Sequence, residues 1–431
     1  MELTPDQAAL ADAVRTLLTR HEQTAQKPPR PGSPTPHQPP APDTAPPPSS
    51  TPHQPPAPHT APPPSPAPHT APPAFPAPYD PALWVRLCEI GVAGLAVPER
   101  YGGAGAGPVE THVVAEELGR RLTPSPLLGS AVLAAQALLA CGDDATRERL
   151  LPAIADGTSL AALAWTGEAG HWDPAQAACA ASGTPGSADG WVLDGEARYV
   201  LDGDTADVLL VTARAPDGIG LFEVDPAGSG VTRSAVATMD TTRRLATVAL
   251  AGAPGRRVDD PAARPAPAAL ARARDLACIA LSAEQVGAAA QALRMTADYV
   301  QVRVQFDRAI GGFQALQHRL ADLHVLVSSA RSLSYAAAQA AADQAAADQA
   351  GADQAGADQA DELGLRAAAA KVYCSETLQQ VAAETIQLHG AIGITWEHDA
   401  HRYLKRAHAA AQLFGQPAEH VARIAAAVID G

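Results

Sequence analysis

The residues best suited to binding a charged ligand lie in two short segments near the end of the chain. Arg303 is followed three residues later by Phe306, and its guanidinium carries several N–H donors that could bind an anionic group. The segment GAIG at 390–393 is rich in small residues, which let a backbone approach a phosphate closely. Taken alone, such an arginine is more often a solvated charge at a helix end, and such a segment is more often a tight turn. Both interpretations stay open from these residues alone.

Candidate acids and metal ligands lie near the same segments. Asp275 stands near the start of a long apolar pattern, where we expect a helix whose dipole favours an ionised carboxylate. Four histidines lie between residues 389 and 408, but only His401 and His408 have helical spacing. An HExxH pattern is absent from the sequence, so we expect no metal site.

The overall composition is that of an acidic globular chain. Its 431 residues include 31 Lys+Arg and 46 Asp+Glu, a net charge of −15, which argues against nucleic acid or an anionic membrane surface as a partner. The five cysteines are scattered and never form a CxxC pair, which excludes a disulfide scaffold and fits a reducing cytosol. The first residues lack a signal-peptide pattern, and the apolar stretches are interrupted by charge. We therefore expect a cytoplasmic protein without a transmembrane helix.

Two low-complexity inserts interrupt the chain. Of the 40 prolines, 25 lie between Pro28 and Pro81, and the segment 28–78 repeats TPHQPPAP. This density favours polyproline II, so we predict a disordered surface loop, with a docking arm for a proline-recognising partner as the alternative. The segment 341–361 repeats ADQA with a period of five, which would scatter its aspartates around a helix. We predict a solvated loop there, with helical structure only at its ends.

Three successive parts of the chain form the fold that positions the candidate residues. Residues 1–157 show helical patterns, 158–265 show alternating apolar runs with Asp-Gly turns, and 266–431 show helical periodicity again. The fold class predicted is therefore α+β and multidomain, with an N-terminal α-helical domain, a middle β-barrel or sandwich domain and a C-terminal four-helix bundle. Helices are expected near 3–23, 109–122, 127–141, 144–155, 267–300, 314–340, 363–388 and 399–412.

Six segments in this order resemble the acyl-CoA dehydrogenase family of flavoproteins. They are LAVPERYGGAG (95–105), VVAEELGRRLTPSP (113–126), LPAIADGTS (151–159), WVLDGEARYVLDGDTADVLLV (191–211), YVQVRVQFDRAIGGFQALQHRLADL (299–323) and IQLHGAIGITWEHDAHRYLKRA (386–407). Within the family, the chain looks most similar to actinobacterial members that act on bulky or unusual acyl-CoAs. The resemblance implies FAD and α,β-dehydrogenation of an acyl-CoA thioester to the trans-2-enoyl-CoA, in which a carboxylate takes the α-proton and the flavin takes the β-hydrogen as hydride.

The resemblance also implies which residues contact FAD. Arg303 matches the arginine that reaches the pyrophosphate across a dimer interface, and Phe306 matches an aromatic residue near the adenine. The other expected contacts are Ile310, Phe313 and Gln314 beside this segment, Gln387, Gly390 and Ala391 at the ADP half, and Trp165, Thr166 and Tyr199 at the isoalloxazine.

Three positions depart from the family pattern. Asp307 stands where a glycine is usual after the aromatic residue, and Ala391 replaces the second glycine of the small-residue turn. Leu201 replaces a threonine two residues after Tyr199. A carboxylate at 307 would repel a pyrophosphate if it pointed toward it.

The catalytic base is the least regular part of the resemblance. One family position for the glutamate corresponds to Phe414, which cannot take a proton, and the other corresponds to Ala277. Asp275, two residues away, is the catalytic base that we predict, and the alternative is an acid that only stabilises its helix. Glu284 and Glu397 are weaker candidates.

The resemblance implies an acyl-CoA substrate, an electron-transfer flavoprotein as acceptor, and a homo- or hetero-oligomer such as a dimer or tetramer. Two alternatives remain for the activity. The chain could be a flavin-binding but catalytically incomplete partner subunit, whose carboxylate comes from a second chain. It could also be an oxygen-using relative of the oxidase type, which the residues do not separate from a dehydrogenase.

Overall fold

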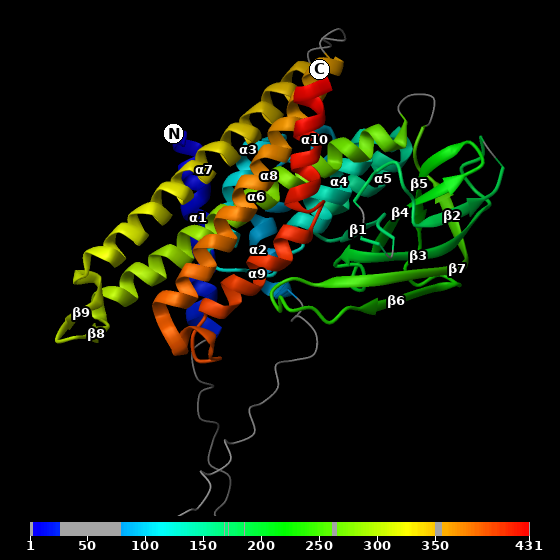
Figure 1. The fold of residues 1–431 in the computed structure, drawn as a ribbon. Helices are drawn as coiled ribbons and strands as arrows, with labels where there is room; N and C mark the ends of the chain where they lie inside the picture. Colours follow the sequence, from blue (N-terminus) through cyan, green and yellow to red (C-terminus); the bar gives the residue numbers. More distant parts are fainter. Residues whose placement is uncertain are drawn as a thin grey trace, which may run out of the picture.

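The computed structural model describes residues 3–25, 79–167, 169–170, 172–184, 186–260, 265–349 and 356–430. The proline-rich insert predicted at 28–78 lies outside the described residues. Figure 1 shows long helices packed side by side with a β domain against one end of them. The predicted order of a helical region, a β domain and C-terminal helices is confirmed. The domain boundaries placed at 157 and 265 stay predictions.

Short helices make up the N-terminal region. Asp80 is the N-cap of helix α2, because its Oδ1 accepts hydrogen bonds from the backbone N–H groups of Ala82 (2.7 Å) and Leu83 (3.2 Å). Pro81 occupies the first helical position, where a missing N–H costs nothing. The elements are α1 (Pro5–Ala25), α2 (Pro81–Glu89), η1 (Val92–Gly94), η2 (Glu99–Tyr101), α3 (Pro108–Arg120), the π-helix η3 (Leu127–Ala134), α4 (Ala135–Cys141) and α5 (Asp144–Ala155).

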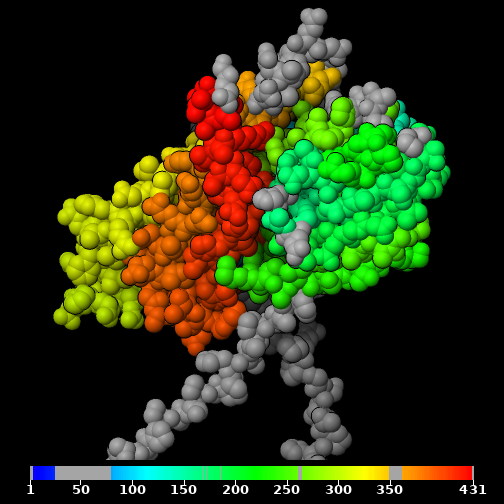
Figure 2. Space-filling view, turned by 45° about the vertical axis from the view of Figure 1, so that its right-hand side comes forward, coloured from blue at the N-terminus to red at the C-terminus, as the bar shows by residue number. Residues whose placement is uncertain are grey.

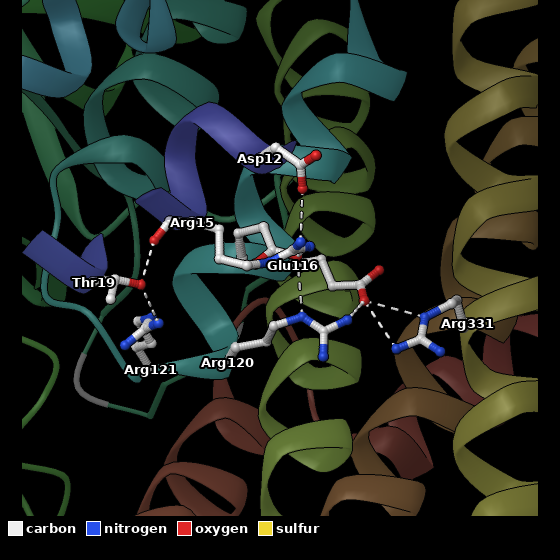
Figure 3. Close-up of polar contacts among 8 residues, drawn as sticks. Asp12, Arg15, Thr19, Glu116, Arg120, Arg121 and Arg331 are labelled. Carbon is white, nitrogen blue, oxygen red and sulfur yellow. Dashed lines mark hydrogen bonds and ion pairs between the residues drawn. The ribbon is translucent and has the colours of Figure 1, made fainter. Parts of the chain in front are cut away.

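Ion pairs tie the N-terminal helices to the C-terminal ones. Glu116 of α3 accepts hydrogen bonds from Arg120 (2.5 Å) and from Arg331 of α7 (2.9 Å), as Figure 3 shows. Arg15 of α1 binds Glu117 on the neighbouring position of α3 at 2.8 Å. These pairs are partly exposed, so each adds at most about 1 kcal/mol, and their effect is to fix the register of the helices.

Helices α3 and α6 cross at a pair of glycines. A Cβ atom built on Gly119 would lie 2.1 Å from the backbone oxygen of Glu284, and one built on Gly287 would lie 1.9 Å from the backbone oxygen of Glu116. The two backbones therefore touch, and only glycine fits at either position. This contact sets the distance between the N-terminal helices and the centre of the bundle.

The middle domain is a seven-stranded sheet that closes on itself. The strand order is β1-β4-β2-β3-β7-β5, and β4 also pairs with β5, so a ring of strands forms with β1 and β6 attached to it. Trp191 and Phe222 fill its centre edge to face, with ring centroids 5.2 Å apart. The strands are β1 (Ala161–Ala164), β2 (Cys179–Ser182), β3 (Trp191–Leu201), β4 (Val208–Ala215), β5 (Gly218–Val224), β6 (Val231–Ala235) and β7 (Leu245–Arg257).

The C-terminal region is a bundle of long helices built around α6. In the part of the chain that the structure describes, α6 is the one helix long and apolar enough to cross a membrane, but 83% of its apolar window is buried inside the protein. It is therefore packed as the central helix of the bundle. The elements are α6 (Ala266–Val302), β8 (Val304–Gln305), β9 (Arg308–Ala309), η4 (Ile310–Gly312), α7 (Gln314–Gln349), α8 (Gly356–His389), η5 (Gly390–Ile394), α9 (Ala400–Gln412) and α10 (Pro417–Asp430).

The prediction of a loop at 341–361 was wrong over most of its length. Helix α7 continues to Gln349 and α8 already begins at Gly356. Ala341 and Gln344, three residues apart, are buried, and Asp348 pairs with Arg272 of α6 at 2.9 Å. Alanine has the highest helix propensity, and one side of the repeat packs on the bundle, so the insert lengthens two helices instead of interrupting them.

We expect Gly287→Ala to destabilise the protein by about 3 kcal/mol or more, because the added methyl group would overlap the backbone of α3. Urea unfolding followed by circular dichroism measures this change. Gly312→Ala is the matched control, since a Cβ there would meet its nearest neighbour at 3.8 Å, an ordinary contact. Equal stability of the two variants would contradict the close helix crossing.

Candidate functional site

A crevice of about 510 Å³ lies between the β domain and the C-terminal helices. Figure 2 shows the β domain, in green, meeting the helices, in orange and red, along this boundary. One wall is formed by Tyr199 of β3 and the segment 236–245, and the other by α9 and the turn after it. Its volume is in the range of small-molecule and cofactor sites.

The two walls of the crevice are joined by a buried cluster of charges. Arg406 of α9 donates hydrogen bonds to Asp240 Oδ2 (2.8 Å) and to the backbone oxygen of Thr242 (2.9 Å), both in the β domain. Glu284 of α6 pairs with Arg406 at 3.4 Å and also with Arg243. Burial by itself would raise the pKa of Asp240, but Arg406 and the Thr242 hydroxyl hold that pKa below its usual value. Asp240 is therefore a structural anion in the wall of the crevice.

Among the expected isoalloxazine contacts, Tyr199 alone lines the crevice. Trp165 and Thr166 are buried behind it, and the Thr166 hydroxyl donates a hydrogen bond to the backbone oxygen of Arg198. The indole nitrogen of Trp165 is buried without a hydrogen-bond partner. Leu201 is also buried, so the position where the family has threonine contributes no polar atom to the crevice.

Arg303 lies at the opposite end of α6, beside an exposed hairpin that Figure 1 places far from the β domain. The strands β8 and β9 are joined by Phe306 and Asp307, which have φ values of 55° and 61°. Both residues in a left-handed conformation make a tight two-residue hairpin turn, and aspartate is among the residues that tolerate this conformation. Phe306 is 85% exposed, and Arg308 lies over the ring of Phe313 at 3.8 Å.

The small-residue turn reaches the same end of the bundle. Tyr299, one turn before Arg303, stacks on His389 with ring centroids 4.4 Å apart, and His389 directly precedes Gly390. Gln387 and Gly390 are exposed, and a Cβ built on Gly390 would meet nothing within 4 Å. Ala391, Ile310 and Gln314 also lie on this partly exposed end. The structure therefore groups the residues expected around the ADP half of FAD.

One chain does not bring the two groups together. Arg303 lies 19 residues beyond Glu284, which contacts the crevice wall through Arg243, so the two are about 28 Å apart along α6. The donors at the exposed end are a guanidinium, amides and an open glycine turn, and an aromatic ring stands beside them. This set suits a dinucleotide, and the crevice suits a flat ring, so the residues fit FAD if each site combines the two ends of two chains.

Asp275 is held in an ion pair. Both of its carboxylate oxygens accept hydrogen bonds from Arg423 of α10, at 2.7 and 2.9 Å, and Arg274 binds it at 3.2 Å. The side chain is buried and is not among the residues that line the crevice. This carboxylate is bound to two guanidinium groups and lies outside the lining of the crevice, so the geometry does not favour Asp275 as a base.

Phe414 fills the other expected base position. It is fully buried, has a φ of 61°, and packs edge to face on Trp172 with ring centroids 5.2 Å apart. Of the described residues that line the crevice, only Asp240 carries a carboxylate, and that carboxylate is bound to Arg406. The described part of this chain therefore presents no free carboxylate to the crevice.

Lys371 is a buried residue near the site that the sequence analysis missed. Its Nζ donates to the backbone oxygens of Ala410 (3.2 Å) and Ala411 (3.0 Å) at the end of α9, and to Ser375 Oγ (3.1 Å). Burial lowers the pKa of Lys371 to about 8. The signal in the sequence is a single lysine in the alanine-rich run RAAAAKVYC, on a face that packs inward. This cation holds the end of the helix that forms one wall of the crevice.

Comparisons with known proteins match both helical regions. The family model described as "Acyl-CoA dehydrogenase, N-terminal domain" matches residues 67–158, and "Acyl-CoA dehydrogenase, C-terminal domain" matches residues 269–429. The acyl-CoA dehydrogenase IpdE2 of Mycolicibacterium smegmatis is 37% identical over 351 residues, which are 81% of this chain and 89% of that protein.

Two solved structures extend the likeness to assemblies. A variant of the Tcur3481-Tcur3483 steroid ACAD has a TM-score of 0.70 and 33% identity, covering 82% of this chain and 90% of the matched chain. The ChsE4-ChsE5 complex from Mycobacterium tuberculosis has a TM-score of 0.74 and 25% identity, covering 100% of this chain and 99% of the matched one.

We expect Lys371→Met to change how stability depends on pH. The lysine pKa is about 8 in the folded protein against 10.5 ordinarily, so the wild type binds fewer protons when folded and its burial cost disappears as pH rises. From pH 8 to 10.5 the wild type should gain roughly 3 kcal/mol relative to the variant. Thermal and urea unfolding of both proteins across this range measures the difference in stability. Both proteins contain the same cysteines, so the titration of the cysteines is common to both. Parallel curves would show that Lys371 is not the titrating group.

Proposed function

Because the chain belongs to the acyl-CoA dehydrogenase family, we propose that it is a subunit of an enzyme that removes hydrogen from the α and β carbons of an acyl-CoA thioester, leaving the trans-2-enoyl-CoA. FAD is the cofactor, and when bound it accepts the β-hydrogen as hydride. The observation that carries the proposal is an aromatic crevice at one end of the bundle and an exposed set of phosphate-binding groups at the other.

Each end of the chain has a separate task in this proposal. Arg303 binds the FAD pyrophosphate of the neighbouring subunit, and Gln387 and the open turn at Gly390 contact its ADP half. Tyr199 packs against the flavin ring in the crevice of its own chain. Asp307 forms the tip of the hairpin and its side chain is exposed.

A second candidate is favoured by the missing carboxylate. We propose that the base is supplied by a different chain and that this subunit is catalytically incomplete by itself. Phe414 and the Asp275–Arg423 pair both support this, because neither position offers a free carboxylate. The ChsE4-ChsE5 structure, a complex of two differently named chains, is a structural neighbour compatible with such an assembly.

The substrate and the electron acceptor are proposed by analogy with related proteins. We propose a bulky acyl-CoA substrate, which agrees with the description of the Tcur3481-Tcur3483 protein as a steroid ACAD. We also propose an electron-transfer flavoprotein as the acceptor of the electrons. A cytoplasmic location is supported by five free cysteines, four of which are buried.

We expect Arg303→Met to weaken FAD binding by about 10- to 100-fold, because a charge-assisted hydrogen bond to a phosphate is worth about 1.5–3 kcal/mol. The flavin absorbance per chain and titration of the apoprotein with FAD measure this loss. Arg294→Met is the matched control, since Arg294 is an exposed residue of the same helix. Full flavin content in Arg303→Met would remove Arg303 from the site.

We expect the chain purified alone to show no flavin bleaching when acyl-CoA thioesters are added anaerobically, and to show bleaching once a second acyl-CoA dehydrogenase chain completes the assembly. If the chain bleaches alone and Asp275→Asn abolishes this, the base lies in this chain and the incomplete-subunit proposal is wrong. Phe414→Glu, with Phe414→Gln as its control, tests the family's base position, because a carboxylate there should restore bleaching to the isolated chain if the missing base is its only defect.

A further inference from the structure

His389 lies where four segments meet at the exposed end of the bundle. It is the last residue of α8 and directly precedes the turn that begins at Gly390. Its ring stacks on Tyr299 of α6, with centroids 4.4 Å apart and an interplanar angle of 24°. The ring of His398, which lies between η5 and α9, stands against it at 4.4 Å. His389 is 4% exposed, so its ring is the packed centre of an otherwise exposed region.

Hydrogen bonds fix the orientation of His389 and the path of the backbone around it. Its Nδ1 lies 2.7 Å from the backbone oxygen of Thr385, which can only accept, so Nδ1 carries the proton and donates. The Tyr299 hydroxyl donates to the backbone oxygen of His389 at 3.4 Å. A Cβ built on Gly393 would lie 3.1 Å from the His389 Cβ, so the turn folds back against this residue. The path of the turn at Gly390 therefore depends on the place of the His389 side chain.

The second ring nitrogen of His389 is bare. Nε2 is buried, and no described residue forms a hydrogen bond with it. Because Nδ1 carries the proton, Nε2 holds a lone pair in the neutral ring, and protonation would bury an N–H group without an acceptor. Burial lowers the pKa of His389, the hydrogen bond to Thr385 opposes this, and the charge of His398 lowers the pKa further.

Of the described residues that face the ring, none supplies a negative charge. The titratable groups against it are Tyr299 from α6 and His398 from the segment before α9, and neither residue type is an anion near neutral pH. Glu384, the acid nearest in the sequence, is bound to Arg319 of α7. The stack therefore favours the neutral ring, and a charged ring would be stabilised only by leaving it.

We propose that His389 is a positioning residue, whose neutral ring holds the turn at Gly390 in the shape that binds the phosphates of the cofactor. The inference rests on the proposed function, which assigns the ADP half of FAD to this turn and to Arg303. Tyr299 joins the two, because it stacks on His389 and stands one helical turn before Arg303 on α6. A buried ring that offers no group to the cofactor thus keeps two exposed groups in register.

The turn should lose stability in acid. When it opens, His389 regains the ordinary histidine pKa of 6.5, which is above its pKa in the packed stack. The open form therefore binds more protons, and the closed form becomes less stable as pH falls below about 6.5. Above pH 7 the ring is neutral in both forms, so the stability of the closed turn no longer changes with pH through this residue.

Hydrogen exchange of the segment 390–396 in the full-length purified chain tests the hold of His389 on the turn. His389→Phe keeps a flat ring against Tyr299 and cannot be protonated, so comparison with it cancels the intrinsic pH dependence of exchange. From pH 7.5 to 5 we expect the wild type to lose up to about 30-fold in protection relative to His389→Phe, since pH 5 lies about 1.5 units below the pKa of the open form. His324→Gln, at an exposed histidine of α7, is the control and should follow the wild type.

Titration of the apoprotein with FAD at pH 7.5 tests the consequence for the cofactor. We expect His389→Ala to raise the dissociation constant by about tenfold, which is about 1.4 kcal/mol, and His389→Phe to restore most of the affinity. Titration of the chain together with a second acyl-CoA dehydrogenase chain repeats the measurement in the assembly.

Two results would overturn the proposal. One is a protection profile of the wild type that stays parallel to that of His389→Phe, and the other is a folded His389→Ala that binds FAD as tightly as the wild type. If His389→Phe does not fold, His389→Asn replaces it, because its amide can still donate to the Thr385 oxygen and does not titrate. A wild type that binds no FAD, alone or in the assembly, would contradict the proposed function, and with it the role toward the cofactor. Exchange would still decide whether His389 holds the turn.

Discussion

The crevice depends on the buried charges that join the β domain to the helices. One apolar cluster lies inside the β domain, and a second joins its strands to the helices through residues such as Leu163, Leu210 and Leu221. Arg406, Asp240 and Glu284 add buried hydrogen bonds of defined length beside the crevice. Removing one partner would leave an uncompensated buried charge, at a cost of about 3–5 kcal/mol. These hydrogen bonds therefore fix the position of α9 against the β domain at the edge of the crevice.

The order of the three regions could be predicted because it rests on local patterns. Apolar residues at spacings of three and four predicted α6, and alternation with Asp-Gly turns predicted the β domain. The repeat at 341–361 was predicted wrongly because its period of five does not place its aspartates on one face of a helix. In the structure the helix is held by the burial of Ala341 and Gln344 and by the ion pair of Asp348 with Arg272. Helix α10 was not predicted, although Pro417 at its first position and Glu419 in its first turn are helix start signals.

The site could be predicted only in part, because its two groups of residues lie far apart along α6 within one chain. Arg303, Gln387 and Gly390 lie together because they stand where α6 and α8 end side by side, and their contact with FAD stays a prediction. It could not tell that Thr166 faces the protein interior or that Asp275 binds Arg423, because α10 comes back onto α6 from 148 residues away. Long-range ion pairs of this kind leave no local pattern. Lys371 was missed for the same reason, since its partners are carbonyl groups of another helix.

The ADQA repeat lengthens the helices of the bundle in steps of one five-residue unit. Within a helix, one unit of five residues advances the chain by about 7.5 Å and turns it by about 140°. Because each unit carries one Asp at the same place, a copy gained or lost ahead of Asp348 would still leave an aspartate at position 348, within reach of Arg272. The phase of α7 against α6 would thus be kept, and a change in copy number would alter only the residues that follow.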